Sequence, residues 1–291
     1  MKPQKTLQEQ LPELRPGQSI ELLKELHILT RDGKLNQDTR RKLKQVYHLV
    51  QFIEPLLNEV MAAKGDVTLA DHGAGKSYLG FILYDLFFKD KSTGWVTGVE
   101  TRAELVQRSQ ALAQRLGFER MRFLATTVQD ALTHPDLPAT VDVVTALHAC
   151  DTATDDASAF GLAKQARHMV LVPCCQAEVA ATMKRNKALN LARTPLAELW
   201  RHPLHTREFG SQITNVLRCL QLEAHGYSVT VTELVGWEHS MKNELILASR
   251  ADSPGQRTQQ QKAVERLGQV LDTLGLQELT SRFGAAASAL G

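Results

Sequence analysis

Hydrophobic residues recur in two rhythms along this chain. From residue 20 to residue 63 they return at every third or fourth position, which is typical of amphipathic helices, and Arg31-Asp32-Gly33 breaks the pattern as a turn does. From residue 67 to residue 172 short apolar runs alternate with helical stretches instead. We therefore expect a helical extension followed by repeated β–α units.

The alternation predicts a parallel sheet with helices on both faces. Strands are expected at residues 67–70, 95–99, 121–125, 141–147 and 169–172. A mostly helical interval follows, and two more strands are expected at 228–235 and 244–249. The turn between these two is too short for a crossover helix, so they are expected to be antiparallel. The expected fold class is α/β, a Rossmann-like sheet of seven strands that is parallel except at its last strand.

Three regions follow from this organisation. Residues 1–63 are expected to form an N-terminal helical extension. Residues 64–252 are expected to form the α/β domain, with a substrate-facing helical insertion at about 176–225. Residues 253–291 are expected to form a C-terminal linker and a helix.

Composition narrows the setting of the protein more than its function. The net charge of +2 is too small to indicate a nucleic-acid or membrane partner by itself. The four cysteines have neither zinc nor disulfide spacing, so we expect no metal and a reducing, cytoplasmic location. We expect no membrane association, because no apolar run approaches the roughly 18 residues that span a bilayer.

Candidate chemistry begins where the first strand ends. Asp71-His72-Gly73-Ala74-Gly75-Lys76-Ser77 follows an apolar run, and a helix is expected to begin near Lys76. Glycines at such a bend let the backbone approach a ligand, and a helix N-terminus offers free N–H groups. A dinucleotide site would need a third glycine where Tyr78 stands, and a phosphate-binding P-loop would need a glycine at Ala70. An acid followed by Gly-x-Gly suits S-adenosylmethionine. Asp71 can accept a hydrogen bond from the ammonium group of the cofactor, while backbone N–H groups bind the cofactor's carboxylate.

Two further acids follow the next two strands. Glu100 ends the second strand, where a carboxylate can accept both ribose hydroxyls of an adenosine. Asp130 follows the third strand and is placed to receive the adenine amino group. Each acid taken alone is also a candidate helix cap, but three in successive turns favour a cofactor site. The remaining cofactor-binding residues of this prediction are His72, Gly73, Gly75, Lys76, Tyr78 and His148.

Three of the expected turns resemble a known family. Residues 71–79, 147–155 and 172–176 resemble the methyltransferase domain of the methyltransferase-like 25 group. That group includes glutathione S-transferase C-terminal-domain-containing proteins and is similar to eukaryotic tRNA 2′-O-methyltransferases. The resemblance covers roughly residues 40–250 and implies a class I S-adenosylmethionine-dependent methyltransferase. His72 departs from the family, which more often has a small residue or cysteine there, and it either narrows the methionine pocket or faces solvent.

The fourth and fifth turns carry candidate catalytic residues. In a parallel sheet of this kind the reacting atoms lie beyond the carboxyl ends of the strands. His148 and Asp151 follow the fourth strand and can remove a proton from the acceptor, while Asp155 can cap the following helix. Cys174 follows the fifth strand and is similar to the proline-cysteine pair of enzymes that attack cytosine covalently, although buried cysteine is commonly a small core residue.

Basic side chains gather at two places. Arg40-Arg41-Lys42-Leu43-Lys44 precedes the α/β domain. The longer cluster lies in the helical insertion, where Glu198 is the only acid from residue 184 to residue 207. An RNA backbone would find favourable charge there, although a solvated helix face explains the first cluster equally well. Trp200 and Phe209 can stack on bases, and Trp200 can instead pack in the core. The candidate substrate-binding residues are Lys184, Arg185, Lys187, Arg201 and Arg207.

Together these features predict an S-adenosylmethionine-dependent methyltransferase that acts on rRNA or tRNA by in-line methyl transfer. One alternative is a small-molecule or protein methyltransferase on the same fold. The others are a non-catalytic binding module that keeps the fold and a P-loop nucleotide hydrolase.

Overall fold

A computed structural model describes residues 11–147, 152–173, 176–186, 193–234, 244–251 and 255–284. The candidate residues His148, Asp151, Cys174 and Lys187 lie outside these ranges. The chain divides into two compact units, Met1–Ala131 and Leu132–Gly291, which are described in turn.

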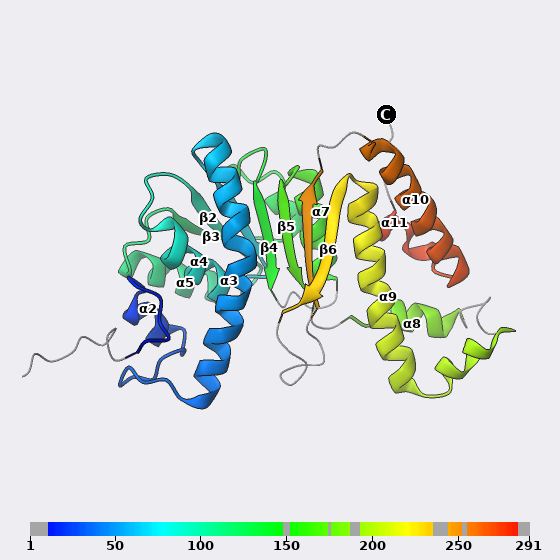
Figure 1. Cartoon of the computed structure of the whole chain (residues 1–291), viewed down its shortest axis with the longest axis horizontal. Helices are drawn as coiled ribbons and strands as arrows, with labels where there is room; N and C mark the ends of the chain where they lie inside the picture. The colour runs from blue at the N-terminus through cyan, green and yellow to red at the C-terminus, as the bar shows by residue number, and fades with distance from the viewer. Residues whose placement is uncertain are drawn as a thin grey trace, which may run out of the picture. The chain divides into compact units, whose positions relative to one another are not determined.

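The described strands form a seven-stranded sheet in the order β3-β2-β1-β4-β5-β7-β6. Strand β7 is antiparallel to both β5 and β6, whereas the pairs β1–β2, β2–β3 and β4–β5 are parallel. This topology confirms the predicted Rossmann-like class, including the antiparallel last strand (Figure 1).

The first unit begins with the predicted helical extension. It consists of α2 (Ile20–Glu25) and the long α3 (Gln37–Lys64). Asn36 and Thr39 cap the start of α3 reciprocally, and Gly65 ends it in the left-handed conformation with φ of 72°. The extension is anchored to the rest of its unit, because the backbone N–H of Ser19 donates to the buried carboxylate of Asp85 at 2.9 Å.

The β–α part of the first unit holds three parallel strands, β1 (Thr68–His72), β2 (Trp95–Glu100) and β3 (Met121–Ala125). Its helical segments are α4 (Tyr78–Leu83), the π-helical η1 (Tyr84–Phe88), α5 (Ala103–Arg115) and α6 (Val128–Ala131).

Two predicted boundaries at the end of β1 were wrong. Strand β1 continues to His72, which is in register with Val99 of β2, so Asp71 and His72 belong to the strand and not to the loop. Helix α4 begins at Tyr78 and not near Lys76, because the backbone is left-handed at Gly73, Gly75 and Ser77.

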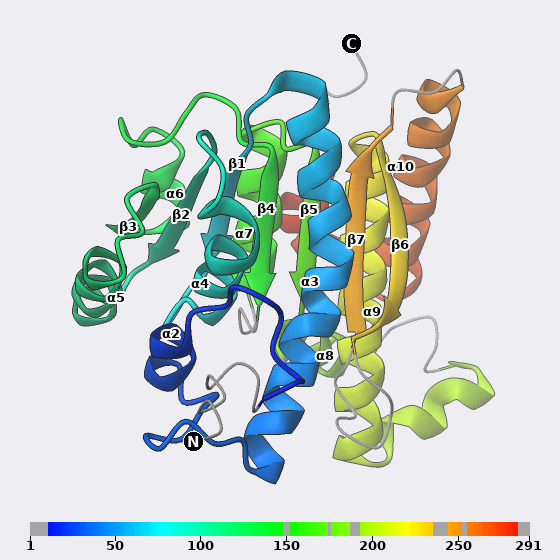
Figure 2. The ribbon, with the colours of Figure 1, turned by 60° about the vertical axis from the view of Figure 1, so that its left-hand side comes forward.

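The second unit contains β4 (Val143–Leu147), β5 (His168–Val172), β6 (Tyr227–Glu233) and β7 (Glu244–Arg250). Its helical segments are α7 (Ala153–Ala163), α8 (Glu178–Arg185), η3 (Pro195–Trp200), α9 (Pro203–Ala224), α10 (Gln256–Thr273), η4 (Gln277–Leu279) and α11 (Thr280–Phe283). Helix α9 contacts both β6 and α10 and lies between them in Figure 1, whereas the turned view of Figure 2 shows it behind β6 and β7.

Helices α8, α9, α10 and α11 enclose a hydrophobic cluster that includes Met183, Leu217 and Phe283. The rings of Trp200 and Phe209 pack against this cluster, with 6.0 Å between their centroids. Both rings therefore pack against the hydrophobic cluster, which is the core alternative considered for Trp200. In the described part of the chain, no helix is both long and apolar enough to cross a membrane.

Candidate functional site

In the turn between β1 and α4, every second residue from 73 to 77 has a positive φ. Gly73, Gly75 and Ser77 have φ values of 62°, 54° and 51°. Glycine adopts this conformation without steric cost, whereas Ser77 does so against its preference. The turn folds back on the end of β2, because the N–H of Ala74 donates to the carbonyl of Val99 at 3.2 Å. The backbone of this loop is therefore held at the carboxyl ends of β1 and β2.

Polar side chains are buried where β1 ends. Asp71 is 2% exposed and His72 is 1% exposed. Burial lowers the pKa of His72 to about 3, so its imidazole is neutral at physiological pH. Of the two alternatives for His72, the solvent-facing one is therefore wrong.

Ser77 is a site residue to which the sequence gave no role in a cofactor site. Its hydroxyl oxygen is buried and has no hydrogen-bond partner among the described residues. A Cβ at Gly80 would lie 2.6 Å from that oxygen and 3.5 Å from Oδ2 of Asp71. The glycine thus leaves room for a hydroxyl and a carboxylate on the same side of α4. A buried hydroxyl without a partner is an unused hydrogen-bonding group in the interior below the turn, and such groups are rare.

Glu100 contacts the glycine turn directly. The N–H of Gly75 donates to Oε2 of Glu100 at 2.8 Å, and the N–H of Arg102 donates to Oε1 at 3.1 Å. The Arg102 guanidinium adds two bonds, from Nε at 3.0 Å and from Nη2 at 3.1 Å. Burial by itself raises the pKa of Glu100, but the hydrogen bonds from Arg102 and Gly75 outweigh it and lower the pKa from 4.5 to about 2.

Arg102 is a second residue that the sequence did not single out, although it lies only two positions after Glu100. Its side chain is 60% exposed, and its Nη2 atom would lie 3.8 Å from a Cβ placed on Gly75. The guanidinium therefore borders both the turn and the carboxylate. Any hydroxyl groups that bind Glu100 would share its oxygen atoms with Arg102.

The other predicted cofactor residues are less closely connected to this centre. Asp130 is exposed and caps α6 together with Thr127, whose hydroxyl donates to Oδ2 of Asp130 at 2.7 Å. Lys76 is exposed, and Tyr78 is partly buried at the start of α4, where burial raises the pKa of its hydroxyl. The structure thus joins Gly75 to Glu100 and buries Asp71 at the end of β1, while the role of Asp130 stays a prediction.

In the second unit, a buried charged network lies next to the fourth and fifth turns. Arg218 of α9 is fully buried, and its Nε donates to Oδ1 of Asp155 at 2.5 Å. Asp155 lies in the first turn of α7. Its carboxylate therefore pairs with a buried arginine, an interaction that the expected helix cap did not include.

The same network reaches two further strand ends. Nη1 of Arg218 donates to the side-chain oxygens of Gln176 at 3.4 Å and Asn215 at 3.0 Å. Asn215 in turn donates to the carboxylate of Glu244, the first residue of β7, at 2.6 Å. The middle of α9 therefore contacts the first turn of α7, the chain just after β5 and, through Asn215, the start of β7.

The basic cluster of the helical insertion is less basic than its sequence suggests. Arg201 pairs with Glu198 at 2.8 Å, and Arg207 pairs with Glu208 at 3.3 Å. Arg185 forms an ion pair with Glu278, which is distant in sequence. Lys184 is exposed and has no ionic partner among the described residues. Glu208 and Glu278 lie outside the window from residue 184 to residue 207, so the sequence count of acids did not include these two ionic partners.

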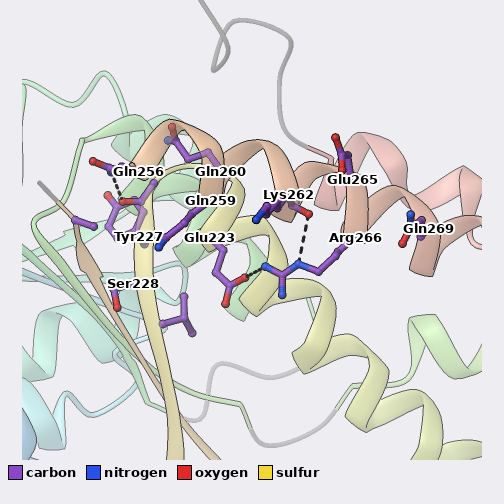
Figure 3. Close-up of a pocket in the computed structure, with 13 residues that line it drawn as sticks. Glu223, Tyr227, Ser228, Gln256, Gln259, Gln260, Lys262, Glu265, Arg266 and Gln269 are labelled. Carbon is purple, nitrogen blue, oxygen red and sulfur yellow. Dashed lines mark hydrogen bonds and ion pairs between the residues drawn. The ribbon is translucent and has the colours of Figure 1, made fainter. Parts of the chain in front are cut away.

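A pocket of about 620 Å³ lies elsewhere in the second unit, between the end of α9, β6 and α10 (Figure 3). Several of its polar groups bind one another. Arg266 pairs with Glu223 at 2.6 Å, and Gln256 donates to the carbonyl of Gly226 at 2.7 Å. None of the predicted site residues lines this pocket. Among the described residues, no three His, Cys, Asp or Glu side chains gather as a metal site.

The strand order, with a glycine turn and a buried acid at the carboxyl end of β1, defines the class of protein. Residues 41–182 match the family described as a methyltransferase domain. Over these residues the chain is similar to a methyltransferase domain, its sheet has the Rossmann-like methyltransferase topology, and it is an enzyme that uses S-adenosylmethionine as its cofactor.

Solved structures with a similar course of the chain include methyltransferases of several kinds. A putative O-methyltransferase from Klebsiella pneumoniae is 13% identical, with 83% of this chain and 94% of that chain covered and a TM-score of 0.47. An rRNA methylase from Streptococcus thermophilus is 8% identical, with 70% and 96% covered and a TM-score of 0.45. Magnesium protoporphyrin IX methyltransferase from Synechocystis PCC 6803, with bound SAH, is 16% identical, with 79% and 93% covered and a TM-score of 0.42. The sequence matches no curated protein.

Glu100→Gln is expected to destabilise the protein in a pH-dependent way. The pKa of Glu100 is about 2 in the folded chain against 4.5 normally, so its stabilisation is complete above about pH 4.5 and is lost as the pH falls through about 2. Urea unfolding at neutral pH should show a loss of about 1.5–3 kcal/mol, the usual range for a hydrogen-bonded charge. The difference from wild type should shrink in acid. A constant difference would contradict the assignment, and the exposed Glu119→Gln serves as control.

Arg218→Met is expected to cost about 3–5 kcal/mol of unfolding free energy, because it leaves the Asp155 carboxylate buried without its main partner. The same change at Arg201, whose pair with Glu198 is exposed, should cost less than about 1 kcal/mol. Adding Asp155→Leu to Arg218→Met should cost less than the two single changes together. Equal losses for the Arg218 and Arg201 variants would show that the buried pair is not important.

Proposed function

We propose that the turn between β1 and α4, together with Glu100, holds the cofactor of this methyltransferase. The observation that carries this assignment is the Gly75–Glu100 hydrogen bond, which joins the glycine turn to one buried acid, while a second buried acid, Asp71, stands in β1 just before the turn. An ammonium group suits the Asp71 carboxylate and the partnerless Ser77 hydroxyl. A carboxylate suits the N–H groups of the turn, and ribose hydroxyls suit Glu100.

The remaining predicted residues complete this assignment. Gly73, Lys76 and Tyr78 belong to the same turn, and buried neutral His72 is the last residue of β1 before it. Asp130 is assigned to the adenine amino group and His148 to the cofactor and the acceptor. Asp130 already caps α6, so it would keep one oxygen on Thr127 while the other binds the adenine.

When bound, the cofactor supplies a methyl group on a positively charged sulfur. This chain has to hold the acceptor atom in line with that methyl group and, where needed, remove a proton from it. We assign proton removal to His148 or Asp151, and we keep Cys174 as the third candidate. The Arg218–Asp155–Gln176 network supports this role, because it fixes the residues that flank the fourth and fifth turns.

We propose RNA, either rRNA or tRNA, as the acceptor, and the cytoplasm as the place of reaction. Exposed cations without an ionic partner among the described residues support it, namely Lys42 and Lys44 on α3 and Lys184 on α8. Free cations are what a phosphate backbone binds, whereas paired ones are already neutralised. The resemblance of the three turns to the methyltransferase-like 25 group, and through it to tRNA 2′-O-methyltransferases, also supports an RNA acceptor.

Asp71→Asn is expected to weaken binding of S-adenosylhomocysteine about tenfold to a hundredfold, because it removes a charge-assisted hydrogen bond while keeping the side chain's shape. Isothermal titration calorimetry measures this. The same change at the exposed Asp90 should leave the affinity unaltered. ATP with Mg²⁺ should not bind, since the turn lacks the P-loop spacing. Unchanged affinity in the Asp71 variant would remove this residue from the site.

Methyl transfer to RNA is the test of the acceptor. Purified enzyme with radiolabelled S-adenosylmethionine should label total RNA from a strain that lacks the gene more strongly than RNA from wild-type cells, whose sites are already methylated. Parallel reactions with the protein fraction and with a small-molecule extract test the alternative acceptors. If the two RNA samples are labelled equally and another fraction is labelled more strongly, the acceptor belongs to that other fraction and the RNA proposal is contradicted.

A further inference from the structure

The first unit contains a groove beside the cofactor turn, and of its lining residues only Lys76 has a role in the function proposed above. Its volume is about 380 Å³, and it is lined from three directions. One wall is the end of α2 and the residues after it, the second is Lys76 of the turn, and the third is α5. Helix α2 lies close to α4 and α5 in both views of the chain (Figures 1 and 2). The N-terminal extension thus builds one side of a groove that reaches the cofactor turn.

Helix α5 presents a continuous stripe to this groove. Leu105, Arg108, Leu112 and Arg115 recur at intervals of three and four residues, so they lie on one face of the helix. The stripe alternates aliphatic and basic side chains. Aliphatic carbon can lie against a sugar ring, while guanidinium groups bind anionic oxygens bidentately.

The basic residues of the groove fall into two kinds. Arg115 is neutralised, because it pairs with Glu21 at 3.1 Å and with Glu25 at 2.6 Å, and these pairs attach α2 to α5. Lys76 and Arg108 are exposed and form no ion pair or hydrogen bond with any residue that the structure describes. Two positive charges on different segments therefore face an open groove without an acidic partner.

We propose that this groove binds the phosphodiester backbone of the RNA acceptor through Arg108 and Lys76, and that the N-terminal extension forms its outer wall. The proposal rests on the proposed function, and it deepens it by naming where the acceptor is held. Lys76 adjoins Gly75, whose N–H binds Glu100, so a phosphate held at Lys76 lies next to the loop assigned to the cofactor. The volume falls within the range of about 300–1,000 Å³ that small ligands or a nucleotide-sized group occupy.

The groove contains a basic residue, Arg108, that the sequence analysis did not select as a candidate for RNA binding. The basic clusters visible in the sequence lie on α3 and in the helical insertion, where several arginines have acidic partners. Arg108 is isolated in sequence, with Glu104 one turn before it, and only the folded chain brings it to the same groove as Lys76. A pair of cations from two segments fixes the path of a strand better than a single flexible run does.

The test is RNA binding by charge-changed variants of the full chain. The probe is a fluorescently labelled single-stranded RNA of about 16 nucleotides, titrated by anisotropy at salt concentrations from about 50 to 200 mM. Arg108→Glu should weaken binding about tenfold and lower the salt slope by about one. Arg108→Lys should retain most of the affinity, because the ammonium still pairs with a phosphate. The matched control is Arg257→Glu on α10, also an exposed arginine without an ionic partner among the described residues, which should bind like wild type.

Two readouts separate the possible failures. Arg108→Glu should bind S-adenosylhomocysteine as tightly as wild type, because Arg108 is not among the assigned cofactor residues. If the wild-type enzyme methylates RNA and Arg108→Glu binds RNA like Arg257→Glu, the groove is not the RNA site although the proposed function stands. If the wild type neither binds nor methylates RNA, both proposals fail. If Arg108→Glu unfolds at a lower temperature than wild type, the variants Arg108→Gln and Arg257→Gln are compared instead. These changes remove the positive charge without adding a carboxylate near Glu104.

Discussion

The hydrogen bond from the Gly75 N–H to Glu100 is the interaction on which the candidate site depends. It joins the turn after β1 to the end of β2, and it is possible only because Gly75 adopts a left-handed conformation with φ of 54°. Arg102 then completes the coordination of the same carboxylate and keeps it ionised. A single buried acid thereby sets the shape of the turn and provides acceptor oxygens at the place where a ribose is expected.

Buried charge is handled differently in the two units. In the first, Glu100 is paired with an exposed arginine, so solvent and ligands can reach one side of the pair. In the second, Asp155 and Arg218 are both buried, and the amide side chains of Gln176 and Asn215 accept hydrogen bonds from Nη1 of the arginine. Replacing such a pair by apolar residues often costs little stability, so we assign it a role in positioning the adjoining chain segments and not in stability alone. The first arrangement suits ligand exchange, and the second suits a fixed scaffold.

The N-terminal extension is part of the first unit and not an independent appendage. Its helix α2 is held by Asp85 on one side and by Arg115 on the other. These contacts bring residues near position 25 to the groove beside the cofactor turn. In a fold whose central sheet is shared by many methyltransferases, such added segments are where differences in acceptor can arise.

The sequence by itself determined the order of elements, because the rhythm of apolar residues follows directly from strand and helix geometry. It also located Asp71, the two glycines and Glu100, since each stands at the end of a hydrophobic run. It could not show that β1 continues through His72, because that depends on pairing with Val99 of another strand. Contacts between distant segments were decided only by the tertiary structure, such as Arg218 with Asp155 and Arg185 with Glu278. Local periodicity fixes what each segment becomes, whereas the charges and cavities of a site depend on which segments pack together.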